Sequence, residues 1–158
     1  MNTLAPTPGQ TVGPFFSFAL VREEGADLVS PSHPGAMTLH GRVLDGAGEP
    51  VPDALVELTR GGDADGWGRA ATDDEGRYAF TTLAPSGPFF AITVLARGLL
   101  DRLFTRAYLP ERSDDPFLQG IAEDRRATLV ATPDERGYVF DIRLQGDDET
   151  VFLTFARD

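Results

Sequence analysis

The stretch RYAFTTLAPSGPFFAITVL, residues 77–95, holds two strand patterns separated by a turn. Over residues 77–82, Tyr78 and Phe80 alternate with smaller or charged side chains, and this period of two predicts a strand with one buried face. Residues 89–95 are apolar almost throughout, which is typical of a strand buried on both faces. Because Pro85-Ser86-Gly87-Pro88 supplies turn residues between the two patterns, the stretch predicts two short strands and a connection.

Short strands of the same character recur along the chain. Runs that alternate or are apolar lie between turn signals such as Asp45-Gly46, and they occupy residues 38–44, 54–59, 103–109, 139–144 and 151–155. Several short strands with turn residues between them indicate a β-sandwich or a barrel. We therefore expect an all-β fold, a β-sandwich of mixed short strands.

Helical signals are confined to one part of the sequence. Asp115-Pro116 is typical of an N-cap followed by proline at the first helical position, and it predicts a short helix that ends near Ile121. Residues 123–131 fit a second one. The sequence thus predicts one or two short helices beside the sandwich.

The N-terminal stretch differs in composition from the rest. Residues 1–34 are rich in proline, glycine and serine and contain one apolar cluster, Phe15-Phe16-Ser17-Phe18. Neighbouring phenylalanines outside a core mark a contact surface. We expect an extended N-terminal arm over residues 1–34 and a β-sandwich domain over residues 35–158.

The composition limits the functions that this chain can have. Its 158 residues fit one domain, and a net charge of −11 argues against binding to nucleic acid or to anionic membranes. The sequence has no cysteine and no lysine, which excludes thiolate metal sites, cysteine nucleophiles and lysine Schiff bases. No apolar run approaches the roughly 20 residues of a membrane span, and no signal peptide is visible, so we expect a cytoplasmic protein.

Few side chains are suited to catalysis. His33 and His40 lie seven positions apart, whereas a metal-binding pair on one strand face would have a spacing of two. We interpret His33 as a loop residue and His40 as a strand residue. Tyr78, Tyr108 and Tyr138 are interpreted as core or interface rings whose hydroxyl groups are hydrogen-bonded. The residue types alone therefore reveal no catalytic set.

Arg97 has a distinctive position, because it comes almost directly after the apolar run of residues 89–95. Its guanidinium group emerges where a buried strand ends. Two interpretations stay open: Arg97 is paired with a structural carboxylate, or it contacts an anionic ligand, since the guanidinium fork suits a carboxylate.

Several stretches resemble the intradiol ring-cleavage dioxygenases. TPGQTVGPFF at residues 7–16 resembles the N-terminal signature of that family, and further matches run nearly end to end: HGRVLDG (40–46), PVPDALVE (50–57), GWGR (66–69), TDDEGRYAF (72–80), ARGLL (96–100), RLFTRAY (102–108) and FDIRLQG (140–146). The last of these, continued through residues 149–152, resembles the alpha type of chain found in two-chain members. The resemblance implies a β-sandwich in which alpha and beta chains share one fold.

The resemblance also implies which chain holds the metal. The beta chain of the two-chain members holds a ferric ion, Fe(III), through two tyrosines and a His-x-His pair. The positions that match this pair are Phe89 and Ala91, and the shortened connections over residues 59–67 and 85–89 contain no ligand tyrosine. Tyr78 lies in a matching motif but not at a ligand position. We expect no cofactor in this chain and Fe(III) in a partner beta subunit.

The function implied by the resemblance is that of the alpha chain in an enzyme complex. The complex would cleave 3,4-dihydroxybenzoate (protocatechuate) with O2 to 3-carboxy-cis,cis-muconate, while the isolated chain would be inactive. The positions that match the alpha wall of the shared pocket are Thr11, Gly13, Pro14 and Arg97. The alternative is a stand-alone, non-catalytic β-sandwich that serves as a binding module or as a spacer module. A co-expressed homologous chain with the iron ligands would distinguish the two.

Overall fold

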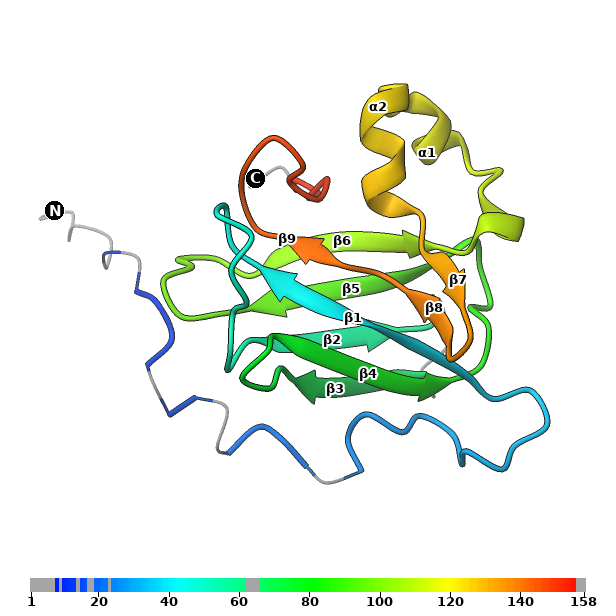
Figure 1. The fold of residues 1–158 in the computed structure, drawn as a ribbon, viewed down its shortest axis with the longest axis horizontal. Coiled ribbons are helices and arrows are strands. Elements are labelled where there is room, and N and C mark those ends of the chain that lie inside the picture. The colour runs from blue at the N-terminus through cyan, green and yellow to red at the C-terminus, as the bar shows by residue number, and fades with distance from the viewer. Residues whose placement is uncertain are drawn as a thin grey trace, which may run out of the picture.

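The computed structural model describes residues 8, 10–13, 15–16, 19–22, 24–61 and 66–155. Its strands are β1 (Met37–Leu44), β2 (Leu55–Thr59), β3 (Trp67–Ala71), β4 (Arg77–Thr82), β5 (Phe89–Leu95), β6 (Leu103–Tyr108), β7 (Thr132–Asp134), β8 (Gly137–Val139) and β9 (Ile142–Arg143). They form two packed sheets, as Figure 1 shows. The predicted all-β sandwich is confirmed.

The two sheets differ in how their strands pair. One sheet has the order β4-β1-β8-β7, and β9 also pairs with β1. In this sheet β1 is antiparallel to β4 but parallel to β8 and β9. The other sheet has the order β3-β2-β5-β6, and all its pairings are antiparallel.

The alternation along the strands builds one core between the sheets. Phe80 on β4 and Phe90, Ile92 and Val94 on β5 are buried there, and each such side chain contributes about 1.5–3 kcal/mol by leaving water. The side chains on the other face of β5 are only half-buried. The prediction that β5 is buried on both faces is therefore wrong, because a two-layer sandwich has one core and its outer faces are only partly covered.

Four short helical segments lie between β6 and β7: η1 (Pro110–Arg112), α1 (Pro116–Gly120), α2 (Glu123–Arg126) and η2 (Ala127–Leu129). The predicted start of α1 is confirmed, because the Asp115 carboxylate accepts a hydrogen bond from the Phe117 amide at 2.7 Å. Leu118 and Leu129 pack with Tyr108 in a second apolar cluster on the outer face of the β3-β2-β5-β6 sheet. No helix among the described residues is long and apolar enough to cross a membrane.

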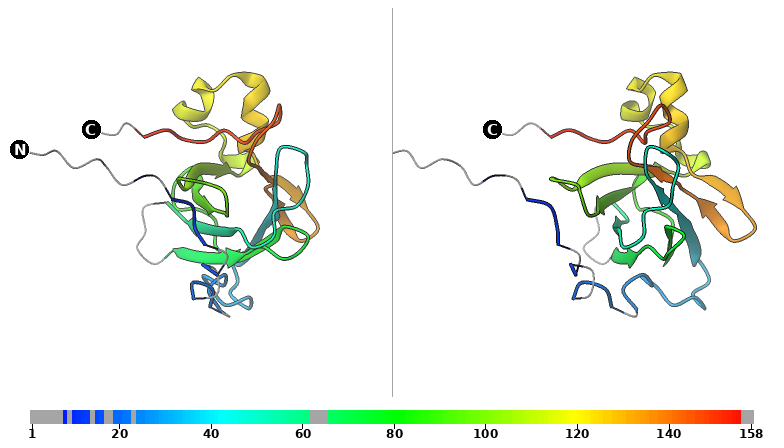
Figure 2. Two further views of the ribbon diagram at one scale, coloured as in Figure 1. Left: turned by 90° about the vertical axis from the view of Figure 1, so that its left-hand side faces the viewer. Right: turned by 60° about the vertical axis from the view of Figure 1, so that its left-hand side comes forward.

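The arm runs along the edge where β3 and β4 lie, as Figures 1 and 2 show. The Leu28 amide donates to the Thr81 carbonyl at 2.8 Å, and the Arg69 amide donates to the Gly25 carbonyl at 2.8 Å. Residues 25–28 thus bridge the two sheets at their open edge. The division at residue 34 stays a prediction. Within the phenylalanine cluster, Phe15 is 75% exposed, whereas Ser17 and Phe18 lie outside the described residues.

Two predicted strands differ from the structure. Residues 139–144 form parts of β8 and β9 rather than one strand, because Phe140 and Asp141 interrupt the ladder where the chain passes close to Gly41. A Cβ atom at Gly41 would lie 2.0 Å from the Phe140 carbonyl oxygen, so only glycine fits there. Residues 151–155 form no strand. Leu153 donates one backbone hydrogen bond to Phe104, which is too little for a ladder.

Candidate functional site

Arg97 lies just past the end of β5 and is paired with Asp53. Its Nη2 atom is 2.8 Å from Asp53 Oδ2, while 53% of the Arg97 side chain stays exposed. Asp53 has a φ of 60°, a left-handed conformation that aspartate tolerates better than most residues. Within the described part of the chain, Asp53 is the only side chain that pairs with Arg97. The guanidinium group therefore keeps donors available to a ligand.

The arm reaches this same place from far away in the sequence. The Gly98 amide donates a hydrogen bond to Thr11 Oγ1 at 2.8 Å, which fixes the arm beside Arg97. Gly13 is exposed, and a Cβ atom built on it would meet nothing within 4 Å. Pro14 lies outside the described residues. The structure thus brings Thr11, Asp53 and Arg97 together, and we call these three residues the open end of β5.

The chemistry of the open end suits a carboxylate. An ion pair as exposed as Arg97–Asp53 contributes about 0–1 kcal/mol to stability, so Asp53 orients the guanidinium group more than it stabilises the fold. Asp53 and Arg97 confirm the first of the two interpretations of Arg97, a structural ion pair. The second, an anion contact, stays a proposal because the remaining donors face solvent.

The opposite end of β5 gathers the positions that the resemblance assigns to iron ligands. Phe89 and Ala91 lie on the outer face of β5, in register with Tyr108 and Arg106 of β6. The two shortened connections meet beside them, because Ser86 donates to the Arg60 carbonyl through its amide at 3.0 Å. The two histidine positions and the described parts of both connections therefore lie at one end of the sheet, and residues 62–65 lie outside the described residues.

An arginine fills this end. The Arg106 guanidinium carbon lies 4.1 Å from the centre of the Phe89 ring and 4.2 Å from that of Phe117. Its Nη1 atom donates to Tyr108 Oη at 3.2 Å. Tyr108 is fully buried, and this burial raises the pKa of its hydroxyl group above the ordinary value of 10.0. We call Phe89, Arg106, Tyr108 and Phe117 the closed end of β5.

The side chains at the closed end do not fit a ferric ion. Iron(III) needs hard nitrogen or oxygen donors in fixed geometry, and Phe89 and Ala91 offer none. Among the described residues, no group of three or more histidine, cysteine, aspartate or glutamate side chains could hold a metal.

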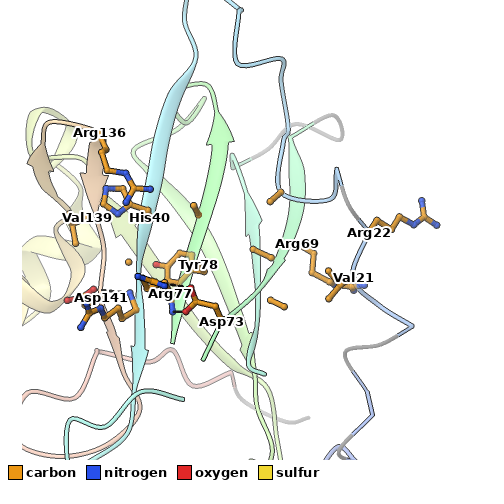
Figure 3. A pocket seen from close by; sticks show the side chains of 16 residues that line it. Val21, Arg22, His40, Arg69, Asp73, Arg77, Tyr78, Arg136, Val139 and Asp141 are labelled. Atoms are coloured by element: carbon orange, nitrogen blue, oxygen red, sulfur yellow. Dashed lines mark hydrogen bonds and ion pairs between the residues drawn. The ribbon is translucent and has the colours of Figure 1, made fainter. Parts of the chain in front are cut away.

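A groove of about 810 Å³ crosses the outer face of β1 and β4. Figure 3 shows its charged lining, in which Arg77 points toward Asp73 while Arg22 points away from the other labelled side chains. Arg77 Nε is 2.8 Å from Asp73 Oδ2, and hydrogen bonds from Arg77 lower the pKa of Asp73. None of the residues assigned to the site from the sequence lines this groove, so it is separate from both ends of β5.

The interpretations of the histidines and tyrosines are confirmed. His33 lies in a turn, and His40 lies on β1 with its Nε2 atom 3.1 Å from Asp134 Oδ2. Tyr78 donates a hydrogen bond to the Phe140 carbonyl, and Tyr138 donates to Glu111 at 2.9 Å. The sequence analysis missed Asp53 and Arg106. Arg106 could have been found from the alternation of Phe104, Arg106 and Tyr108 on one strand face.

Comparison with known proteins places the chain in a family. A family described as the carboxypeptidase regulatory-like domain matches residues 38–109, from β1 to just past β6. The protocatechuate 3,4-dioxygenase alpha chain of Burkholderia cepacia is 36% identical, and the alignment covers 97% of this chain and 99% of that relative. This chain belongs to the protocatechuate 3,4-dioxygenase family.

The remaining comparisons agree with this family. The protocatechuate 3,4-dioxygenase beta chain of Burkholderia cepacia is 32% identical, over 70% of this chain and 64% of that relative. The dioxygenase domain of a dioxygenase carbohydrate-binding protein fusion from Streptomyces sp. SirexAA-E has the same fold, with a TM-score of 0.56 at 24% identity, over 90% of this chain and 99% of that one. The expected intradiol family and alpha type are confirmed.

The length of the alignment supports the expected shortening. It spans 198 positions, whereas this chain has 158 residues. The alpha-chain relative therefore contains stretches that this chain lacks.

Proposed function

We propose that this chain is the alpha subunit of a protocatechuate 3,4-dioxygenase and completes the active site of a homologous, iron-bearing beta subunit. The complex cleaves protocatechuate with O2 to 3-carboxy-cis,cis-muconate. The observation that carries this proposal is the end-to-end match to an alpha chain, combined with Phe89 and Ala91 at the positions assigned to iron ligands. Beside an alpha chain, the family also has a beta chain, which implies a hetero-oligomer.

The Fe(III) belongs to the beta subunit in this proposal. When bound there, it supplies the Lewis acidity that ring cleavage needs. This chain contributes no ligand, because its closed end of β5 presents two rings and a guanidinium group. The absence of cysteine agrees with a cytoplasmic complex.

The contribution of this chain to catalysis is a wall of the shared pocket, formed by Thr11, Gly13, Pro14 and Arg97. Arg97 binds the substrate carboxylate through the donors that Asp53 leaves available, since its side chain is 53% exposed. Thr11 holds the arm beside Arg97 through its hydrogen bond from Gly98. A net charge of −11 repels anions at long range, so a local guanidinium group is needed to favour protocatechuate over uncharged catechol.

The alternative function is a stand-alone module without catalysis. The match to the carboxypeptidase regulatory-like domain over residues 38–109 favours it. That match leaves out the arm and the helices, whereas the alpha-chain match includes them. A module would be a stable monomer with no need for a partner.

Co-expression distinguishes the two functions. The chain is produced together with a homologous chain that carries two tyrosine and two histidine iron ligands, and one of the two is tagged. The proposal predicts co-purification, one iron per pair and oxygen uptake with protocatechuate, whereas this chain purified alone shows neither iron nor uptake. A chain that remains a monomer beside its partner, or that binds one iron by itself, would contradict the proposal.

A further inference from the structure

The guanidinium group of Arg106 is enclosed by two aromatic rings on the outer face of the β3-β2-β5-β6 sheet. It lies between the Phe89 and Phe117 rings, at 4.1 and 4.2 Å from their centres, and its Nη1 atom donates to the buried Tyr108 hydroxyl at 3.2 Å. Ring faces attract a cation, and the tyrosine oxygen accepts a hydrogen bond from the guanidinium group. The two elements that hold it, β5 and α1, come from opposite sides, so the position of the group is fixed.

No carboxylate among the described residues forms a direct ion pair with the Arg106 guanidinium group. An arginine side chain is always protonated in proteins. The buried Asp115 carboxylate accepts from the Phe117 amide at 2.7 Å and acts on the Tyr108 hydroxyl, whose pKa is raised by burial and by this carboxylate. Arg106 therefore brings a permanent charge to the closed end of β5 without a direct ion-pair partner in the described part of the chain.

This charge lies where metal ligands would converge. Position 91 is directly opposite Arg106 across the strand pair, and position 89 is directly opposite Tyr108. Side chains directly opposite each other have Cβ atoms about 4.5–5.5 Å apart. A histidine pair at positions 89 and 91 would thus point its nitrogens, together with Tyr108 Oη, at the space that the guanidinium group occupies.

We propose that Arg106 is the resident cation of the closed end of β5 and that it excludes metal ions from this chain. The inference rests on the proposed function, in which the chain leaves iron to its partner. It adds that the loss of histidines is not the only barrier: restoring them creates no metal site while Arg106 remains. A metal dication and a fixed guanidinium group a few ångströms apart repel each other strongly in a half-buried site.

Three variants of the full chain test this inference with Co²⁺, whose visible absorption reports tetrahedral nitrogen and oxygen ligands. The first is Phe89→His with Ala91→His, and the second adds Arg106→Gln. The third adds Arg102→Gln instead, which removes the same charge from the exposed residue before β6, whose guanidinium carbon lies 5.2 Å from the centre of the Phe104 ring. Circular dichroism melting confirms that each variant is folded, and Arg106→Met, which keeps an apolar stem between the rings, replaces Arg106→Gln if that variant is not.

The expected result is Co²⁺ binding at least about 30-fold tighter in the variant without Arg106 than in the other two. Equal affinity in the histidine pair with and without Arg106 would overturn the inference, and so would a variant without Arg106 that binds no tighter than the unaltered chain. Because this test uses Co²⁺ and no partner or turnover, its failure leaves the co-expression result untouched, and the reverse also holds.

Discussion

An arginine lies at each end of β5, and the surroundings of the two differ. Arg106 reaches the closed end from β6, and Arg97 follows the open end. β5 runs from Phe89 to Leu95, so its two ends are about 20 Å apart along the strand. At the closed end, Arg106 is held between two rings and bonded to a buried hydroxyl. At the open end, the Arg97 side chain is 53% exposed and forms an ion pair with Asp53 through one nitrogen, Nη2. The two arginines differ in the cover around their guanidinium groups, and this difference is why we expect Arg106 to serve the fold and propose that Arg97 binds a ligand.

The helices account for the difference. The segments from η1 to η2 pack over the start of β5 and supply Phe117 and Leu118 to the closed end. Among the described residues, the arm and the β1–β2 connection contact the end of β5 through Thr11 and Asp53. We therefore expect substitutions at the closed end to change stability and those at the open end to change substrate binding.

The largest effect on stability is expected from Phe89→Ala. Full burial of a phenylalanine makes this change cost about 3–5 kcal/mol, and Phe89 is half-buried, so we expect a loss of about 2–3 kcal/mol in the free energy of unfolding. Urea denaturation measures it. The matched control is Leu100→Ala, because Leu100 is 66% exposed and its loss should cost less than about 0.5 kcal/mol. Equal losses of unfolding free energy in Phe89→Ala and Leu100→Ala would contradict the claim that the closed end of β5 is a packed part of the fold.

A smaller loss is expected from Arg106→Gln in the otherwise unaltered chain. Two cation–ring contacts and one hydrogen bond disappear, and each cation–ring contact is worth about 0.5–1 kcal/mol, so unfolding should become easier by about 1–2 kcal/mol. Arg102→Gln removes one exposed contact and should have less than half that effect. A more stable Arg106→Gln variant would show that the buried charge is a net cost to the fold.

The loss of stability at alkaline pH tests how fully the Tyr108 hydroxyl is enclosed at the closed end. Burial raises the pKa of Tyr108 in the folded state, so the folded chain keeps a proton that the unfolded chain loses above pH 10. Stability then falls as pH rises past 10, by at most about 1.4 kcal/mol per pH unit for each such tyrosine.

Tyr108→Phe should flatten this decline, and Tyr78→Phe should flatten it further, because complete burial raises the pKa of Tyr78 well above 10.0. Thermal melting between pH 8 and about 11 measures both slopes. An unchanged slope in both variants would mean that neither hydroxyl is as enclosed as described.

The smallest effect is expected from Asp53→Asn at the open end. Asparagine keeps the size and tolerates the φ of 60°, and an exposed ion pair contributes about 0–1 kcal/mol. The melting temperature should stay nearly unchanged. Asp53→Val is the contrasting variant, because a β-branched residue is strained at that φ and should cost about 1–3 kcal/mol. Equal losses would show that Asp53 matters through its charge rather than its backbone.

The alternation of side chains was sufficient to predict β1 and β4, because one buried face leaves a local pattern. β5 was predicted from its apolar run, and the start of α1 from Asp115-Pro116. β3 was not predicted, since Gly68 and its alanines give little contrast between faces. The tail at residues 151–155 has a strand-like composition but pairs through one backbone bond, which composition cannot reveal.

The candidate site was only half accessible to sequence reasoning. Arg97 and Thr11 came from motifs, and the structure brings them together through the hydrogen bond between Thr11 and Gly98, which lies 87 positions further along the chain. Asp53 was missed because its contact depends on a left-handed turn in a different connection. The strand face of Arg106 could be read from the alternation with Phe104 and Tyr108, but its contacts depend on strand register and on Phe117, which the packed helices place.

The most direct test of the account is the kinetics of Arg97→Ala in the assembled complex, with protocatechuate and with catechol as substrates. A charge-assisted hydrogen bond to a carboxylate is worth about 1.5–3 kcal/mol, so KM for protocatechuate should rise about 10- to 100-fold. The KM for catechol, which has no carboxylate, and the melting temperature should stay nearly constant. Equal losses on both substrates together with a lower melting temperature would contradict the account and reduce Arg97 to the partner of Asp53.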